Sequence, residues 1–107
     1  MIIKKKIAYW GRVEGAVAYH VRVTDVGVIA DTKDLEFVKP QRIEQVDVSV
    51  PQIEFDIGSM DVPVVEGLHD VFISSVDKFG NEPDPLEFRG AEFDFTPPPP
   101  VTVGGFR

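Results

Sequence analysis

The chain has no cysteine, only two histidines and no long apolar run. The absence of cysteine excludes disulfides, thiolate nucleophiles, iron–sulfur clusters and cysteine-ligated zinc. No apolar stretch approaches the roughly 20 residues that a membrane-spanning helix needs, so we expect no membrane insertion. Ile7 to Trp10 is followed at once by Gly11 and Arg12, which leaves no apolar segment for a Sec-type signal. The localisation is therefore left open.

The two histidines, His20 and His69, give little basis for catalysis. A nucleophilic triad would need one of them beside a serine or threonine and a carboxylate, and no Gly-x-Ser-x-Gly turn is present. No His-x-His or His-x-x-x-His spacing offers a metal site. We therefore expect a protein that is not an enzyme, with no catalytic residue, no metal and no cofactor.

Oxygen ligands for calcium crowd one turn, at Asp77, Asn81, Glu82 and Asp84. Their spacing does not match the twelve-residue loop of an EF-hand. Ordinary turn chemistry, in which such side chains bond the local backbone, is the preferred interpretation.

Acidic residues outnumber basic ones, and the net charge of −7 repels phosphate backbones and anionic lipids. We therefore expect no nucleic-acid partner. The excess lies in residues 54–107, which contain three Lys or Arg and eleven Asp or Glu. This acidic half either meets a basic partner or a divalent cation, or only keeps the chain soluble, and the last is the commonest role of such charge.

At 107 residues the chain is long enough for one core. Apolar residues alternate with polar ones at a period of two, and turn residues separate the runs, which predicts an all-β chain. Strands are expected at Lys5 to Trp10, Val17 to Thr24, Val46 to Ile57 (two strands, or one bent at Pro51), Val71 to Val76 and Leu86 to Phe95, with weaker candidates at Val28 to Ala30 and Leu35 to Val38. Gly90 predicts a β-bulge in the last main strand.

The run Val71 to Val76 is the expected centre of the fold, because β-branched and aromatic residues fill it and Asp77 to Asn81 supplies a turn. Phe72 and Val76 fall on its outward phase, opposite the phase of Ile73. This outward apolar pair is either an interaction surface or is covered by long neighbouring side chains.

Short strands at this spacing predict two antiparallel sheets packed face to face as a β-sandwich. Trp10, the alternating run Tyr19 to Val23, and Val76-Asp77-Lys78-Phe79-Gly80-Asn81-Glu82 resemble fibronectin type III modules of the bacterial or phage type, which are immunoglobulin-like sandwiches. The resemblance covers roughly residues 8–95. It implies that Trp10 lies in the core and that Tyr19 opens the inward face of the following strand.

The chain departs from this family at three places. The family's tyrosine early in the central strand, whose hydroxyl bonds the preceding corner, falls on His69, which can make a similar bond through its ring. The inward positions before Trp10 fall on Ala8 and Lys6, although lysine is rarely buried. The family's first strand, roughly ten or more residues ahead of that tryptophan, has only Met1 to Lys5 in which to lie.

We divide the chain into a sandwich module, residues 1–96, and a proline-led extension, residues 97–107. Pro97 to Pro100 predicts a polyproline II spacer, and Val101 to Phe106 predicts a further short strand. Three alternatives are open. The extension is a linker, or it fills the place of the first strand in a neighbouring copy, or it folds back on its own domain.

We expect a non-enzymatic structural module whose partner is another protein, either a further copy in a homo-oligomer or a tandem module. The side chains expected at this contact are Val101, Val103 and Phe106, added as a strand to the edge of the neighbour. A virion or a cell surface is the kind of assembly in which such a module would serve.

The alternative is a surface recognition module that binds a carbohydrate or a protein. In the geometry that the resemblance implies, the loops after Trp10 and after Val76 meet at one end of the sandwich, where Arg12 and Phe79 would act as anchors. Phe72 and Val76 would form a second contact surface if they are not covered.

Overall fold

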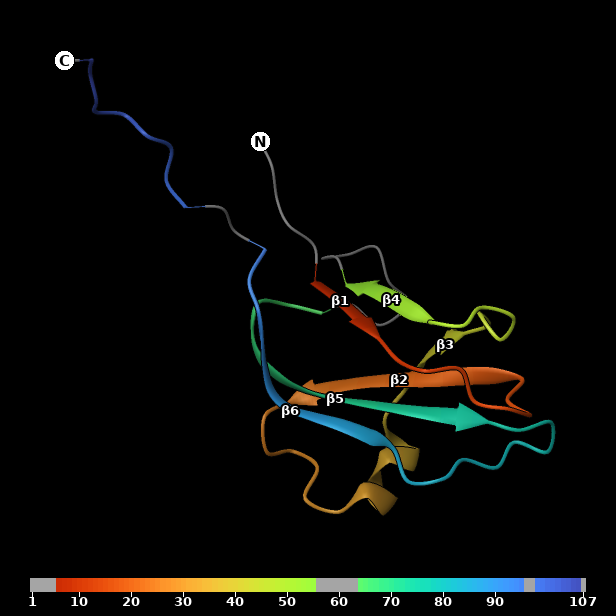
Figure 1. Cartoon of the computed structure of the whole chain (residues 1–107). Helices are drawn as coiled ribbons and strands as arrows, with labels where there is room; N and C mark the ends of the chain where they lie inside the picture. Colours follow the sequence, from red (N-terminus) through yellow and green to blue (C-terminus); the bar gives the residue numbers. More distant parts are fainter. Residues whose placement is uncertain (1–5, 56–63, 96–97, 107) are drawn as a thin grey trace.

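The computed structural model describes residues 6–55, 64–95 and 98–106. These residues form strands and one short 3₁₀ helix, labelled in chain order β1 (Lys6–Tyr9), β2 (Ala18–Asp25), η1 (Thr32–Phe37), β3 (Gln41–Ile43), β4 (Gln52–Phe55), β5 (Gly67–Val76) and β6 (Leu86–Phe93) (Figure 1). No helix in the described part of the chain is both long and apolar enough to cross a membrane.

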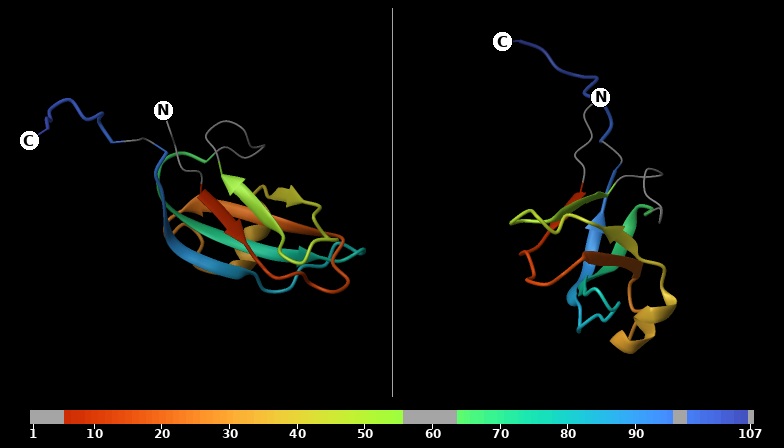
Figure 2. Two further views of the ribbon diagram at one scale, coloured as in Figure 1. Left: turned by 45° about the horizontal axis from the view of Figure 1, so that its top comes forward. Right: turned by 90° about the vertical axis from the view of Figure 1, so that its right-hand side faces the viewer.

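The strands form two antiparallel sheets. The larger sheet has the order β3-β2-β5-β6, and β1 pairs with β4 in the smaller one. Figures 1 and 2 show the smaller sheet lying over one face of the larger sheet. The predicted all-β chain with two antiparallel sheets in a sandwich-like arrangement is confirmed.

The main core fills the space between the two sheets. It contains Trp10, Tyr19, Val21, Ile53, Phe55, Val64, Val71, Ile73, Phe93 and Phe95. The rings of Phe55 and Phe93 lie 5.0 Å apart, so an aromatic pair joins the two sheets. Trp10 packs edge-on against Tyr19 at 5.4 Å, and full burial of such side chains contributes about 1.5–3 kcal/mol each. The predicted core position of Trp10 is confirmed.

The central strand β5 is also covered on its second face. Phe72 is 1% exposed and packs in a small cluster with Ile29 and Leu35. The guanidinium of Arg89 lies 4.8 Å from the centre of the Phe72 ring. Val76 on the same strand is buried as well. The interpretation of Phe72 and Val76 as an open interaction surface is therefore wrong: neighbouring side chains cover Phe72, and Val76 is buried.

The segment that covers Phe72 is not the pair of short strands predicted at Val28 to Ala30 and Leu35 to Val38. Residues 32–37 form η1 instead, because Asp31 caps this helix by accepting the backbone N–H of Lys33. Leu35 of this short helix is buried against the sheet. The alternating pattern was too short to distinguish a strand from a short 3₁₀ helix.

Other strand predictions need smaller corrections. The expected strand at Val46 to Val50 is a series of turns and bends, and the strand β4 begins only at Gln52, after Pro51. Proline has no N–H to donate to a sheet, which favours this break. Residues 56–57 of the same predicted strand lie outside the described residues.

A β-bulge interrupts β6 at the predicted position. Gly90 has a φ of +69°, which favours glycine, and the register between β5 and β6 shifts around Asp70. The buried carboxylate of Asp70 accepts the N–H groups of Gly90 and Gly27 at 2.9 and 3.0 Å. These bonds, with help from Arg89, lower the pKa of Asp70. One carboxylate thus joins the bulge to the loop after β2.

A polar network holds the loop between β5 and β6 against the outer face of the larger sheet. Glu82 accepts two bonds from Arg22, at 2.9 and 3.2 Å, and one from the hydroxyl of Ser74 at 2.6 Å. His20 lies 3.0 Å from the same carboxylate. Burial raises the pKa of Glu82, but these bonds and the charges of Arg22 and His20 outweigh it, so the pKa falls to about 2.

We expect Glu82→Gln to lower the free energy of unfolding by about 1–2 kcal/mol at pH 7, because charge-assisted hydrogen bonds are lost. The loss is limited to this size because solvent reaches part of the Glu82 side chain. The pKa of Glu82 is lower in the folded than in the unfolded chain. Its stabilisation is therefore complete above about pH 4.5 and is lost as the pH falls towards 2.

Urea unfolding at several pH values measures both effects. Asp84→Asn is the control, because its carboxylate in the same loop makes none of these contacts. Equal stability of Glu82→Gln and the original chain at pH 7 would contradict the role of the network.

Candidate functional site

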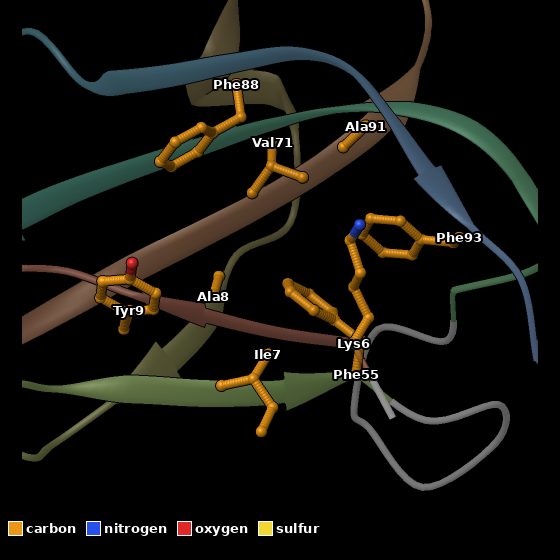
Figure 3. A pocket seen from close by; sticks show the side chains of 9 residues that line it. All are labelled: Lys6, Ile7, Ala8, Tyr9, Phe55, Val71, Phe88, Ala91 and Phe93. Carbon is orange, nitrogen blue, oxygen red and sulfur yellow. The ribbon is translucent and has the colours of Figure 1, made fainter. Parts of the chain in front are cut away.

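An apolar groove lies between β1 of the smaller sheet and β6 of the larger sheet. Its volume is about 340 Å³, and Figure 3 shows the side chains that line it. They are Lys6, Ile7, Ala8 and Tyr9 of β1, Phe55 of β4, Val71 of β5, and Phe88, Ala91 and Phe93 of β6. The groove thus lies beside the main core, whose Phe55, Val71 and Phe93 stay buried, and its exposed apolar lining comes from Ile7, Tyr9 and Phe88.

The inward face of β1 borders this groove. Ala8 pairs with Ile53, and Lys6 pairs with Phe55, so Ala8 and Lys6 share the face of two buried side chains. Lys6 itself is exposed, and in Figure 3 its side chain extends along the groove towards Phe93. Lys6 can lie on the predicted inward face of β1 because the groove beside it is open to solvent.

Both strands that border the groove have an unpaired edge within the described residues. β1 pairs with β4 alone, and β6 pairs with β5 alone. The N–H of Trp10 donates to the carbonyl of Pro51, and bonding alternates along an antiparallel strand. The backbone groups of Ile7 and Tyr9 therefore face away from β4, towards the open side.

The two edges are not equivalent. Along β6 the bulge at Gly90 breaks the regular spacing of backbone groups, whereas β1 keeps an unbroken register from Lys6 to Tyr9. A strand added from outside would find regular partners on β1 and irregular ones on β6. The β1 edge is therefore the better template.

The C-terminal tail, residues 98–106, extends away from the sandwich in Figures 1 and 2. Val101 and Val103 are 92% and 89% exposed, and Phe106 is fully exposed. These residues form no strand. The predicted strand at Val101 to Phe106 is therefore wrong for the single chain: the tail pairs with neither of the two open edges, and folding back on its own domain is not observed.

The loops at the other end of the sandwich come together as predicted. A hollow there is lined by Gly11 and Val13 from the loop after β1 and by Pro83 and Asp84 from the loop after β5. The side chain of Phe79 is 78% exposed. This end therefore presents an aromatic ring to solvent.

The turn that carries Phe79 is well bonded. Asp77 accepts the backbone N–H groups of Phe79 and Asn81, both at 2.9 Å. These bonds lower the pKa of Asp77, and the bond from the backbone of Asn81 has the largest effect. The ammonium of Lys78 lies 5.1 Å from the centre of the Phe79 ring. Arg12, the other predicted anchor, is exposed, and its backbone N–H donates to Ser49.

The predicted corner bond of His69 is present. Its Nε2 atom lies 2.7 Å from the carbonyl of Val65, and its Nδ1 atom lies 3.3 Å from the carbonyl of Thr24. His69 is buried and packs against the ring of Phe93 at 5.3 Å. This histidine therefore serves the fold, joining the start of β5 to the end of β2.

Acidic and histidine side chains do not gather into a metal site in the part of the chain that the structure describes. The oxygen atoms of Asp77 receive hydrogen bonds from the turn itself, in agreement with ordinary turn chemistry.

The sequence did not reveal the groove between β1 and β6, because the groove depends on which strand edges remain unpaired.

We expect the backbone amides of Ile7 and Tyr9 to exchange hydrogen at least about tenfold faster than that of Trp10 in dilute solution, because the bond from Trp10 to Pro51 has no counterpart at the open edge. Hydrogen exchange followed by NMR measures this difference. Equal protection of the three amides in the dilute chain would show that the β1 edge is already paired.

Comparison with known proteins returns no family model, no curated relative and no solved structure that matches this chain. The role of the chain therefore has to be inferred from its groove, its tail and its end loops.

Proposed function

We propose that this chain is a non-enzymatic structural module of the fibronectin type III-like kind, and that copies assemble by strand addition. The tail of one copy, Val101 to Phe106, occupies the groove of another and pairs with β1. The single observation that carries the proposal is an open apolar groove beside an unpaired strand edge, in a chain that also has an exposed apolar tail.

The strand order supports this assignment. Immunoglobulin-like sandwiches pair their second strand with their fifth in one sheet and their third, sixth and seventh strands in the other. β1 and β4 match the first of these pairs, and β2, β5 and β6 match the second set. The first strand of such a sandwich lies beside the second, and within the described residues that side of β1 carries no strand and borders the groove.

The chemistry of the tail suits the groove. Val101 and Val103 are two residues apart and so point to the same side of an extended chain. β-branched residues pack well on a pleated surface. Burial of each valine contributes about 1.5–3 kcal/mol, and each backbone bond to the β1 edge contributes about 0.5–1.5 kcal/mol. Pro97 to Pro100 limit the conformations of the free tail, which lowers the entropy lost on binding.

We expect the substitution of Val101 and Val103 together by serine to raise the dissociation constant for self-association about 100-fold or more, because the buried apolar contact is lost. Sedimentation over a wide concentration range measures the mass. The control substitutes Val26 and Val28, which have the same spacing and are 50% and 64% exposed in the loop after β2.

Deletion of residues 98–107 should likewise leave a monomer at every concentration. An unchanged chain that is monomeric at all concentrations reached, or an assembly that survives the serine substitutions, would contradict the proposal.

A second candidate function rests on Phe79. An exposed aromatic ring held on a well-bonded turn is a suitable face for the apolar side of a sugar ring, so this end could bind a carbohydrate. We expect Phe79→Ala to weaken binding about tenfold on an array of purified polysaccharides and to leave the oligomeric state unchanged. Phe37→Ala is the control, because Phe37 is 81% exposed at a different place. Failure of the original chain to bind any polysaccharide removes this candidate.

A further inference from the structure

Resting on the proposed function, we infer that the assembly is polar: each copy donates its tail in one direction, antiparallel to β1 of the next copy, with Val103 opposite Ala8. The copies then follow one another head to tail and all have the same orientation. A reciprocal dimer, in which two copies exchange tails, is excluded by the same geometry. The inference follows from three features of the chain.

The first feature is the direction of pairing. Every strand pair in the described residues is antiparallel, including the pair of β1 with β4. Antiparallel ladders are slightly more stable per residue than parallel ones. The tail is therefore expected to run from the Tyr9 end of an acceptor β1 towards its Lys6 end.

The second feature is the place where the tail leaves its own domain. β6 ends at the end of the sandwich where β1 begins, and the tail points away from that end (Figures 1 and 2). Proline fixes φ near −65° and removes the N–H donor, so Pro97 to Pro100 resist the sharp reversal that would bring the tail back along its own β1. The tail is thus directed to a neighbour.

These two features fix the polarity. A tail that enters a groove from the Tyr9 end requires that end of the acceptor to face the Lys6 end of the donor. The acceptor then has the orientation of the donor, and its own tail leaves at its far end. A two-fold dimer would place two Lys6 ends face to face, and each tail would have to pair parallel to β1. The contact is therefore heterologous and can repeat along a fibre or close into a ring.

The third feature is the register. Ala8 and Lys6 face the groove, so the tail residues opposite them also point inward. Placing Val103 opposite Ala8 puts Val101 opposite Trp10 and Gly105 opposite Lys6. The lysine side chain extends along the groove (Figure 3), and glycine leaves room for it. In this register Val103 meets the apolar lining, and Val101 lies opposite Trp10 at the end of the groove.

The absence of cysteine makes a direct test available. Residues opposite each other at a non-hydrogen-bonded position of an antiparallel pair have Cα atoms about 4.5 Å apart, which suits a disulfide. Ala8 is such a position, because its neighbours Ile7 and Tyr9 supply the backbone bonds. A chain with both Ala8→Cys and Val103→Cys is oxidised and separated on a denaturing, non-reducing gel.

We expect a ladder of cross-linked dimers, trimers and longer species that disappears on reduction. The matched control carries Ile7→Cys with Val103→Cys, whose cysteines lie on opposite faces, and should give at least about tenfold less cross-linking. Mixing a chain that has only Ala8→Cys with one that has only Val103→Cys should give a cross-linked mixed dimer and nothing longer through this contact.

The other outcomes distinguish strand addition itself from the polar arrangement of the copies. Cross-linked dimers without longer species overturn the polar arrangement and leave strand addition intact. An internal cross-link in the monomer overturns both. Assembly of the unaltered chain without cross-linking of the double variant overturns the antiparallel register. Sedimentation of the unaltered chain is the second measurement, and species larger than a dimer are expected to grow with concentration.

Discussion

The fold depends on the burial of both faces of β5. On one face Val71 and Ile73 join the core between the sheets, and on the other Phe72 packs beneath the segment that contains Leu35. Because β5 also bonds β2 and β6 along its two edges, it is enclosed on four sides. A strand enclosed in this way can be apolar in both phases, which is the pattern that Val71 to Val76 shows. The rest of the structure is arranged to supply these covers.

The two covers are unequal, and the inequality leaves the groove that we propose as a binding site. The outer cover is completed within the chain by η1 and by the polar network around Glu82. Within the described residues the inner cover consists of two strands, so it is narrower than the four-stranded sheet beneath it. The groove lies where the two sheets part, between β1 and β6. A further strand on the β1 edge would bring the two sheets closer to equal width.

The sequence predicted the main strands because alternation and turn residues are local signals: the run Tyr19 to Val23, the turn at Gly80 and the bulge at Gly90 were all found in this way. It did not predict that Leu35 covers Phe72, because the pattern was too short to reveal the 3₁₀ helix and the contact joins residues distant in the chain. The salt bridge between Arg22 and Glu82 was missed for the same reason. The groove was not predicted, because it depends on which strand edges remain unpaired in the fold.

In the assembly that we propose, one chain folds alone and then accepts a strand, and the polar networks that stabilise the chain lie apart from the groove. The networks of Asp70 and Glu82 join loops to the four-stranded sheet on the side away from β1. The aromatic contact of Phe55 with Phe93 already connects the two sheets beneath the groove. A donated strand therefore adds burial at an edge without replacing a contact that the monomer needs. Its binding free energy can then go into association between copies, since little of it is required to order the acceptor.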